Sequence, residues 1–83
     1  MRERKHPIGD KNIVGQRIRE KRESIGLKQK NFLTQLQVSG LDLNSSGLSK
    51  IEGQTRAVND SELIIISEVL GVTVHWLLGL SDE

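Results

Sequence analysis

The residues best suited to polar recognition lie in one short segment, NSSGLSKIE, at positions 44–52. Its serine hydroxyls donate or accept hydrogen bonds, and its lysine can reach a nitrogen, oxygen or phosphate acceptor. The available chemistry is therefore hydrogen bonding to a polar or anionic partner. The candidate recognition residues are Ser45, Ser46, Ser49 and Lys50. The alternative is that these side chains form an ordinary solvated helix face.

Catalytic and metal-binding patterns are absent from the sequence. His6 and His75 are the only histidines, and there is no cysteine. The composition therefore provides no thiolate ligands and no disulfide, which fits a reducing compartment. The block GLSKIEG lacks the glycine spacing and the GK[ST] ending of a phosphate-binding loop. We expect no enzyme, metal, cofactor or small-molecule ligand.

The charge is distributed unevenly along the chain. Residues 1–30 hold ten Lys or Arg and four acids, whereas residues 31–83 hold two and seven. The first third could face a polyanion, although a solvated tail followed by a charged helix would give the same count. The longest apolar run is the four residues 63–66, against roughly 20 for a membrane span. We expect a cytoplasmic protein.

The spacing of apolar residues predicts an all-α fold. Val14, Ile18 and Ile25 fall on one face of a first helix, for example, and later segments repeat this periodicity. Residues 1–11 lack it and are expected to form a flexible basic arm, with residues 12–83 as one small domain. The predicted helices span residues 12–25, 28–38, 45–53, 60–70 and 74–78.

Short polar residues mark the predicted helix starts. Asn44 and Thr73 are suited to N-caps, and the spacing of Asn59 and Glu62 is that of a capping box. Glycine is favoured just after a helix, where a left-handed conformation is common. The predicted stops are Gly26, Gly53 and Gly71.

Two charged residues interrupt otherwise apolar stripes. Arg22 lies on the inward face of the first predicted helix, and Glu52 lies four residues after Leu48 on that of the third. A lone buried charge is costly, so the simplest arrangement is that Arg22 and Glu52 form an ion pair. The alternative places both at partly exposed flanks.

Three blocks carry a family resemblance: RIREKRESIGLKQKNFLTQLQV, LNSSGLSKIEGQTR and ELIIISEVLGVTVHWLLG. Over residues 13–80 the chain resembles the lambda-repressor-like helix-turn-helix family of phage repressors, Cro proteins and Xre-type regulators. The resemblance implies a compact five-helix domain that binds double-stranded DNA. In that family the third helix lies in the major groove. Arg22 and Glu52 match its recurrent ion pair.

Candidate DNA contacts follow from the resemblance. The serines and lysine of the third predicted helix would contact bases, with Gly47 leaving room for close approach. Gln29 matches the glutamine that meets a phosphate at the start of the second helix. For Arg56 the alternative is a merely solvated side chain. The candidate phosphate contacts are Lys28, Gln29, Asn44 and Arg56.

The chain departs from the family pattern between its second and third predicted helices. Lys28 replaces the usual N-cap residue, and Leu33 and Gln37 replace a small alanine and a turn glycine. The interval from Leu36 to Leu48 is also longer than usual. A longer turn removes the need for a tight glycine and leaves the angle of the third helix open.

The last predicted helix is rich in apolar residues. They are too many for one or two turns to bury, so part of this set should cover a partner surface. The family that the chain resembles commonly dimerises through its C-terminal elements, so the resemblance implies a homodimer. A two-fold dimer would place its recognition helices about 34 Å apart. The candidate interface residues are Trp76, Leu77 and Leu80. The alternative is that Trp76 closes a small core.

Together these features predict a sequence-specific DNA-binding transcriptional regulator, most simply a repressor, of bacterial or phage origin. The alternative function is a protein-interaction module of the antitoxin or anti-repressor type that uses the same fold. Steep salt dependence of binding to a defined duplex would favour the first.

Overall fold

The computed structural model describes residues 11–80, which form five α-helices and no strand. This confirms the predicted all-α fold. Residues 1–10, which hold nearly all of the predicted basic arm, lie outside the described part. The helices are α1 (Gly15–Ser24), α2 (Gln29–Val38), α3 (Ser45–Glu52), α4 (Asp60–Leu70) and α5 (Val74–Leu77).

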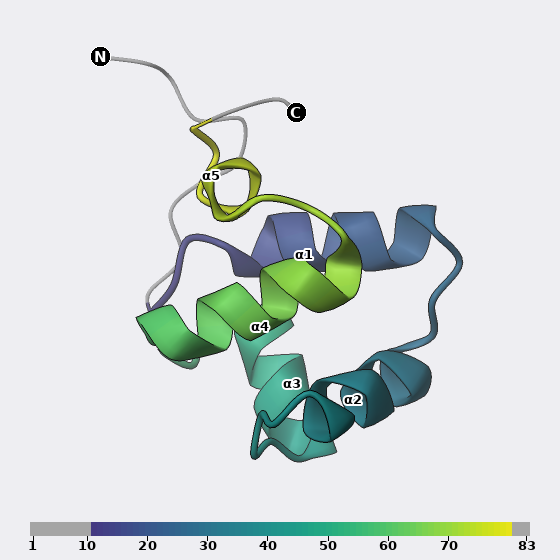
Figure 1. The fold of residues 1–83 in the computed structure, drawn as a ribbon. Helices are drawn as coiled ribbons and strands as arrows, with labels where there is room; N and C mark the ends of the chain where they lie inside the picture. Colours follow the sequence, from purple (N-terminus) through teal and green to yellow (C-terminus); the bar gives the residue numbers. More distant parts are fainter. Residues whose placement is uncertain (1–10, 81–83) are drawn as a thin grey trace.

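The helices enclose one core between two layers (Figure 1). Helices α1 and α4 pack against each other, α3 and α2 lie below them, and α5 lies against α4 at the opposite end. Each helix contributes at least one fully buried apolar side chain, and burying one such side chain stabilises the fold by about 1.5 to 3 kcal/mol. The fully buried side chains are Ile18, Phe32, Leu36, Leu48, Ile51, Ile66 and Leu77.

The first helix is shorter at both ends than predicted. The Oδ1 atom of Asn12 accepts hydrogen bonds from the backbone N–H groups of Val14 and Gly15, so the helix begins after this turn. At the other end Ile25 is the C-cap, and Gly26 adopts a left-handed φ of 70°. The prediction that Ile25 faces the core is wrong, because it lies beyond the helix and its exposure is 50%.

The predicted caps of the later helices are confirmed. Asn44 Oδ1 accepts from the Gly47 N–H at 2.7 Å, and Thr73 caps α5 in the same way. Asn59 and Glu62 form a reciprocal capping box at the start of α4. Lys28, the N-cap of α2, makes no side-chain cap hydrogen bond.

Helix α3 ends at the predicted stop, with Gly53 as its C-cap. Gly53 has a right-handed φ of −83°, and the left-handed residue is Gln54, with φ 66°. A non-glycine residue pays a steric penalty there. Contacts with the segment before α1 hold it in place: the Gln54 carbonyl accepts from the Lys11 N–H at 3.1 Å, and Gln54 Nε2 donates to the Asn12 carbonyl at 3.2 Å.

The backbones of α1 and α3 meet at Gly15. A Cβ atom built on Gly15 would overlap the carbonyl oxygen of Ile51, so no larger residue fits without a shift. The buried amide of Asn12 reinforces this junction by donating to the carbonyls of Ile51 and Arg56, at 3.1 and 2.8 Å. The start of α1 and the end of α3 are thereby fixed to each other.

The long connection between α2 and α3 is anchored at several points. Leu41 and Leu43 are buried in the core. Gln37 Nε2 donates to the Leu43 carbonyl at 2.8 Å, which closes the loop against α2. This bond orders the chain where it leaves α2.

Candidate nucleic-acid interface

Helix α3 has two faces of different character. Its inner side chains Leu48, Ile51 and Glu52 are buried, as the sequence predicts. The opposite face carries the four candidate base-contacting residues, and all four are exposed: Ser45, Ser46, Ser49 and Lys50. The structure therefore presents these residues to solvent together, on a helix held from behind.

The predicted pair of Arg22 and Glu52 is confirmed. Arg22 Nε donates to Glu52 Oε2 at 2.8 Å, and Nη2 donates to Oε1 at 3.1 Å, in a bidentate arrangement between α1 and α3. A third donor, Nη1, reaches the Leu27 carbonyl at 2.9 Å. The alternative of partly exposed flanks is wrong, because the two residues are only 9% and 7% exposed. Full hydrogen bonding makes their burial tolerable.

Gln29, the first residue of α2, lies beside α3. Its Nε2 atom donates to Glu52 Oε1 at 3.3 Å, and its Oε1 atom accepts from the Ser49 hydroxyl at 3.5 Å. The start of α2 therefore adjoins the exposed face of α3. This places a predicted phosphate contact next to a predicted base contact.

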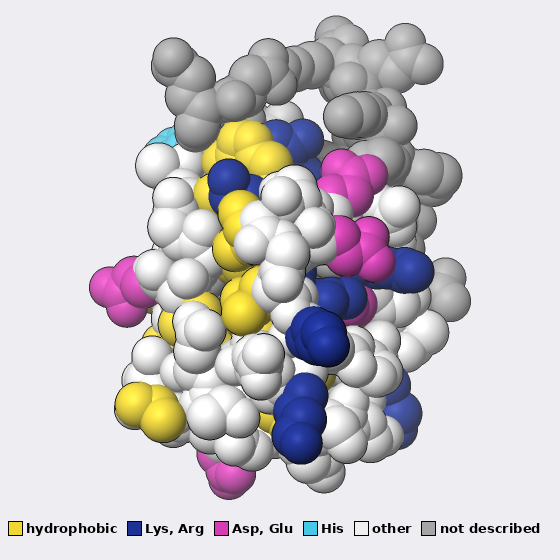
Figure 2. Space-filling view, turned by 90° about the vertical axis from the view of Figure 1, so that its right-hand side faces the viewer, with side chains coloured by type: hydrophobic (Ala, Val, Ile, Leu, Met, Phe, Trp, Pro, Cys, Tyr) yellow, Lys and Arg dark blue, Asp and Glu magenta, His cyan; other side chains and the backbone are white. Residues whose placement is uncertain are grey.

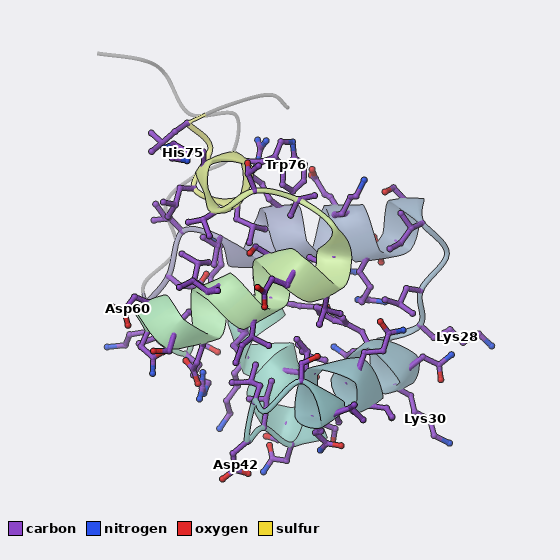
Figure 3. The ribbon with its side chains drawn as sticks, viewed as in Figure 1. Lys28, Lys30, Asp42, Asp60, His75 and Trp76 are labelled. Atoms are coloured by element: carbon purple, nitrogen blue, oxygen red, sulfur yellow. The ribbon has the colours of Figure 1, made fainter. Side chains whose placement is uncertain are left out.

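Two lysines extend from the same end of α2. Lys28 and Lys30 are exposed, and Figure 3 shows both pointing into solvent, whereas Asp42 and Asp60 lie elsewhere on the molecule. Figure 2, which is turned to face this side, shows Lys and Arg side chains near its centre, with Asp or Glu and hydrophobic side chains close to them. The cations and the exposed start of α2 suit an anionic partner.

Arg56 forms hydrogen bonds with an acidic side chain. The alternative, that Arg56 is merely solvated, is therefore wrong. Its Nη1 and Nη2 atoms donate to the two carboxylate oxygens of Glu62 at 3.2 and 2.9 Å. This hydrogen bonding lowers the pKa of Glu62 despite partial burial, and raises the pKa of Arg56. Any phosphate contact by Arg56 would be made by a guanidinium already oriented by Glu62.

A polar hollow of about 500 Å³ lies at the start of α3. Arg56 and Asn44 both line it, together with Asp42 from the long loop. Asn44 caps α3 through its Oδ1 atom at the same place. Two predicted phosphate contacts are thus brought together, beside a carboxylate that would oppose an anion.

The structure gives a reason for the glycine at position 47 that was not predicted. A Cβ atom at this position would lie 2.7 Å from Leu43 Cδ1 and 3.2 Å from Asn44 Oδ1. The space beside Gly47 is therefore filled by the chain's own loop. The glycine lets the loop pack on α3, and the expectation that it leaves room for a partner to approach stays a prediction.

The three candidate interface residues near the C-terminus differ in their burial. Leu77 is fully buried in the core, so its assignment to a dimer surface is wrong. The short α5 turns it toward the other helices. Trp76 is partly buried against the core, with the Arg17 guanidinium 4.1 Å from its ring centroid. Leu80 is 59% exposed and remains a candidate interface residue.

Two side-chain contacts that fix the site were not predicted from the sequence. The buried amide of Asn12 ties the end of α3 to the chain before α1, and Glu62 orients Arg56. Asn12 has the residue type of a capping residue at a helix start, which was a usable signal. The Glu62 contact spans six residues through a loop and has no periodicity to reveal it.

Within residues 11–80 no cluster of acidic or histidine side chains could hold a metal ion, and no helix is long and apolar enough to cross a bilayer. Comparisons of the chain with protein-family models, with curated proteins and with solved structures return no match.

Proposed function

We propose that this protein is a sequence-specific DNA-binding transcriptional regulator that inserts α3 into the major groove. The observation that carries the proposal is the two-faced character of α3. Its buried face is anchored by Leu48, Ile51 and the Arg22–Glu52 pair, while its exposed face offers three serine hydroxyls and one lysine. Small polar residues on a rigid helix suit a groove about 12 Å wide.

The start of α2 supports the same orientation. Gln29 lies next to the exposed face of α3, because its Oε1 atom accepts from the Ser49 hydroxyl, and the exposed Lys28 directly precedes it in the chain. A helix N-terminus with a nearby cation favours a phosphate group. With α3 in the groove, α2 would therefore approach the DNA backbone.

The regulator acts as a homodimer in this proposal, and the simplest mode of control is repression by occupancy of the bound site. Leu80 offers an exposed apolar side chain for this contact. A two-fold arrangement would space the two α3 helices by about 34 Å, one turn of DNA.

Selection of bound duplexes from a random pool tests the proposal directly. We expect one enriched sequence with two related half-sites, and an affinity that falls steeply as salt rises, because phosphate contacts release counterions. Binding that is uniform over all sequences would contradict it.

Uniform binding would favour the alternative, a protein-interaction module of the antitoxin or anti-repressor type. The specific observation behind that alternative is the exposure of the apolar side chain of Leu80. In such a module this surface would contact a different protein, and α3 would be an ordinary solvated helix.

A further inference from the structure

The side chain of Gln29 has a defined orientation. The Glu52 carboxylate is buried in its bidentate pair with Arg22, and both of its oxygens accept hydrogen bonds from the guanidinium. The amide group of Gln29 must therefore turn its nitrogen toward Glu52 Oε1, at 3.3 Å. Its oxygen then faces the other way, toward α3.

This orientation determines what the Ser49 hydroxyl can do. Ser49 Oγ lies 3.5 Å from Gln29 Oε1, a long hydrogen bond. An amide oxygen has no hydrogen to donate, so in this bond the hydroxyl hydrogen points toward Gln29. The two lone pairs of Ser49 Oγ are left for the solvent side, and the exposed serine acts as an acceptor.

We propose that Ser49 is a specificity-determining residue that accepts a hydrogen bond from an exocyclic amino group of a base. This inference rests on the proposed function. In the major groove adenine N6 and cytosine N4 present such donors, whereas guanine O6 and thymine O4 present acceptors. Ser49 therefore selects adenine or cytosine over guanine or thymine at one position of each half-site.

The neighbouring Lys50 selects in the opposite sense. Its ammonium group only donates, so any base that it contacts must offer an acceptor such as guanine O6 or N7. Ser45 and Ser46 are exposed serines for which no contact orients the hydroxyl toward Gln29, so they supply no comparable preference. The orientation of Ser49 thus arises from the contact between α2 and α3.

The test compares relative affinities for duplexes selected from a random pool, using the full chain. The variants are Ser49→Ala, Gln29→Ala and, as a control, Ser61→Ala, which changes an exposed serine on α4. Ratios within one variant are used, because loss of a phosphate contact by Gln29 weakens all duplexes alike. Circular dichroism confirms that each variant is folded.

For the wild type and Ser61→Ala we expect one position at which adenine or cytosine is preferred about fivefold, near the low end of a base contact. Ser49→Ala should remove that preference and leave other positions unchanged. Gln29→Ala should release the hydroxyl and admit guanine and thymine at the same position.

The outcomes separate the two proposals. Absence of any enriched sequence for the wild type overturns the proposed function and this inference with it. An enriched sequence with no position sensitive to Ser49→Ala, or with guanine or thymine at that position, overturns the inference alone. An unchanged preference in Gln29→Ala shows that Gln29 does not orient Ser49, and also overturns it.

Discussion

At the residue scale, the carboxylate of Glu52 connects the buried ion pair to the exposed face of α3. It accepts both donors of the Arg22 fork and the amide of Gln29, which itself contacts Ser49. A single buried group thus fixes α1 against α3 and orients a side chain at the exposed surface. Loss of either charge leaves the other buried and unpaired.

Removing one partner should therefore be severely destabilising. We expect Glu52→Ala or Arg22→Ala each to reduce the free energy of unfolding by about 3 to 5 kcal/mol. The double variant should lose less free energy of unfolding than the two single variants together, since neither charge is then left unpaired. Urea unfolding followed by circular dichroism measures all four proteins. Strict additivity would show that the two side chains are not coupled.

The contact between Arg56 and Glu62 gives stability a defined dependence on pH. The hydrogen bonds from Arg56 lower the pKa of Glu62 from its ordinary value of 4.5. The carboxylate thus contributes stability that is complete above that ordinary value and is lost as the pH falls through the lower folded-state pKa. Raising the pH above neutrality should leave this contribution unchanged.

Urea unfolding between pH 7 and pH 3 measures this effect. The wild type should lose more stability over this interval than Glu62→Gln, whose side chain does not titrate. Glu68→Gln, on the exposed side of the same helix, serves as the matched control. An acid loss of equal size in wild type and Glu62→Gln would contradict the assignment.

At the scale of the elements, the position of α3 depends on how closely α1 approaches it. Gly15 lies against the carbonyl of Ile51, and Asn12 donates to the same carbonyl. An alanine at a helix position usually raises stability relative to glycine. Here the added methyl group meets backbone, which cannot rotate away.

Gly15→Ala should accordingly destabilise the protein by about 1 to 3 kcal/mol, the usual range for overpacking. The measurement is the midpoint of urea or thermal unfolding. Ser61→Ala, an exposed change in the first turn of α4, should shift the midpoint very little. A more stable Gly15→Ala variant would show that the two helices separate readily.

The elements themselves were largely predictable, because apolar periodicity and caps are local signals. Asn44, Thr73 and the Asn59–Glu62 box start their helices where the sequence indicates. The misplaced residues depend on tertiary contacts. Gln54 takes the left-handed position because it is held by hydrogen bonds with Lys11 and Asn12. Both of these residues lie more than forty positions earlier in the chain. Ile25 is exposed because the helix ends before it.

The candidate site was predictable in part for the same reason. The exposed face of α3 and the Arg22–Glu52 pair follow from helical spacing together with the cost of a lone buried charge. The filling of the Gly47 site by Leu43 could not be read in this way, because it depends on the path of a long loop.

At the scale of the whole molecule, the C-terminal apolar residues divide between the core and the surface. Leu77 belongs to the core, whereas Leu80 is exposed. Periodicity in a helix of four residues is too short to separate these two roles, which explains why the sequence analysis grouped them. The proposed dimer therefore depends on Leu80.

Leu80→Asp should abolish the proposed dimer and leave the fold intact, because the change lies on an exposed side chain. Analytical ultracentrifugation should show a dimer for the wild type and a monomer for this variant. Leu77→Asp should instead unfold the chain, since it buries an unpaired charge. Two folded proteins with identical sedimentation would exclude Leu80 from any interface.

The separation of the two faces of α3 also bears on how the protein could be re-engineered. Ser45, Ser46 and Lys50 lie on the exposed face, whereas the contacts that hold the helix come from Asn12, Leu48, Ile51 and Glu52. A library randomised at those three exposed positions should therefore remain folded in most of its members. Under the proposed function, such a library would be a source of proteins with new target sequences on one unchanged scaffold, with Ser49 kept because it contacts Gln29.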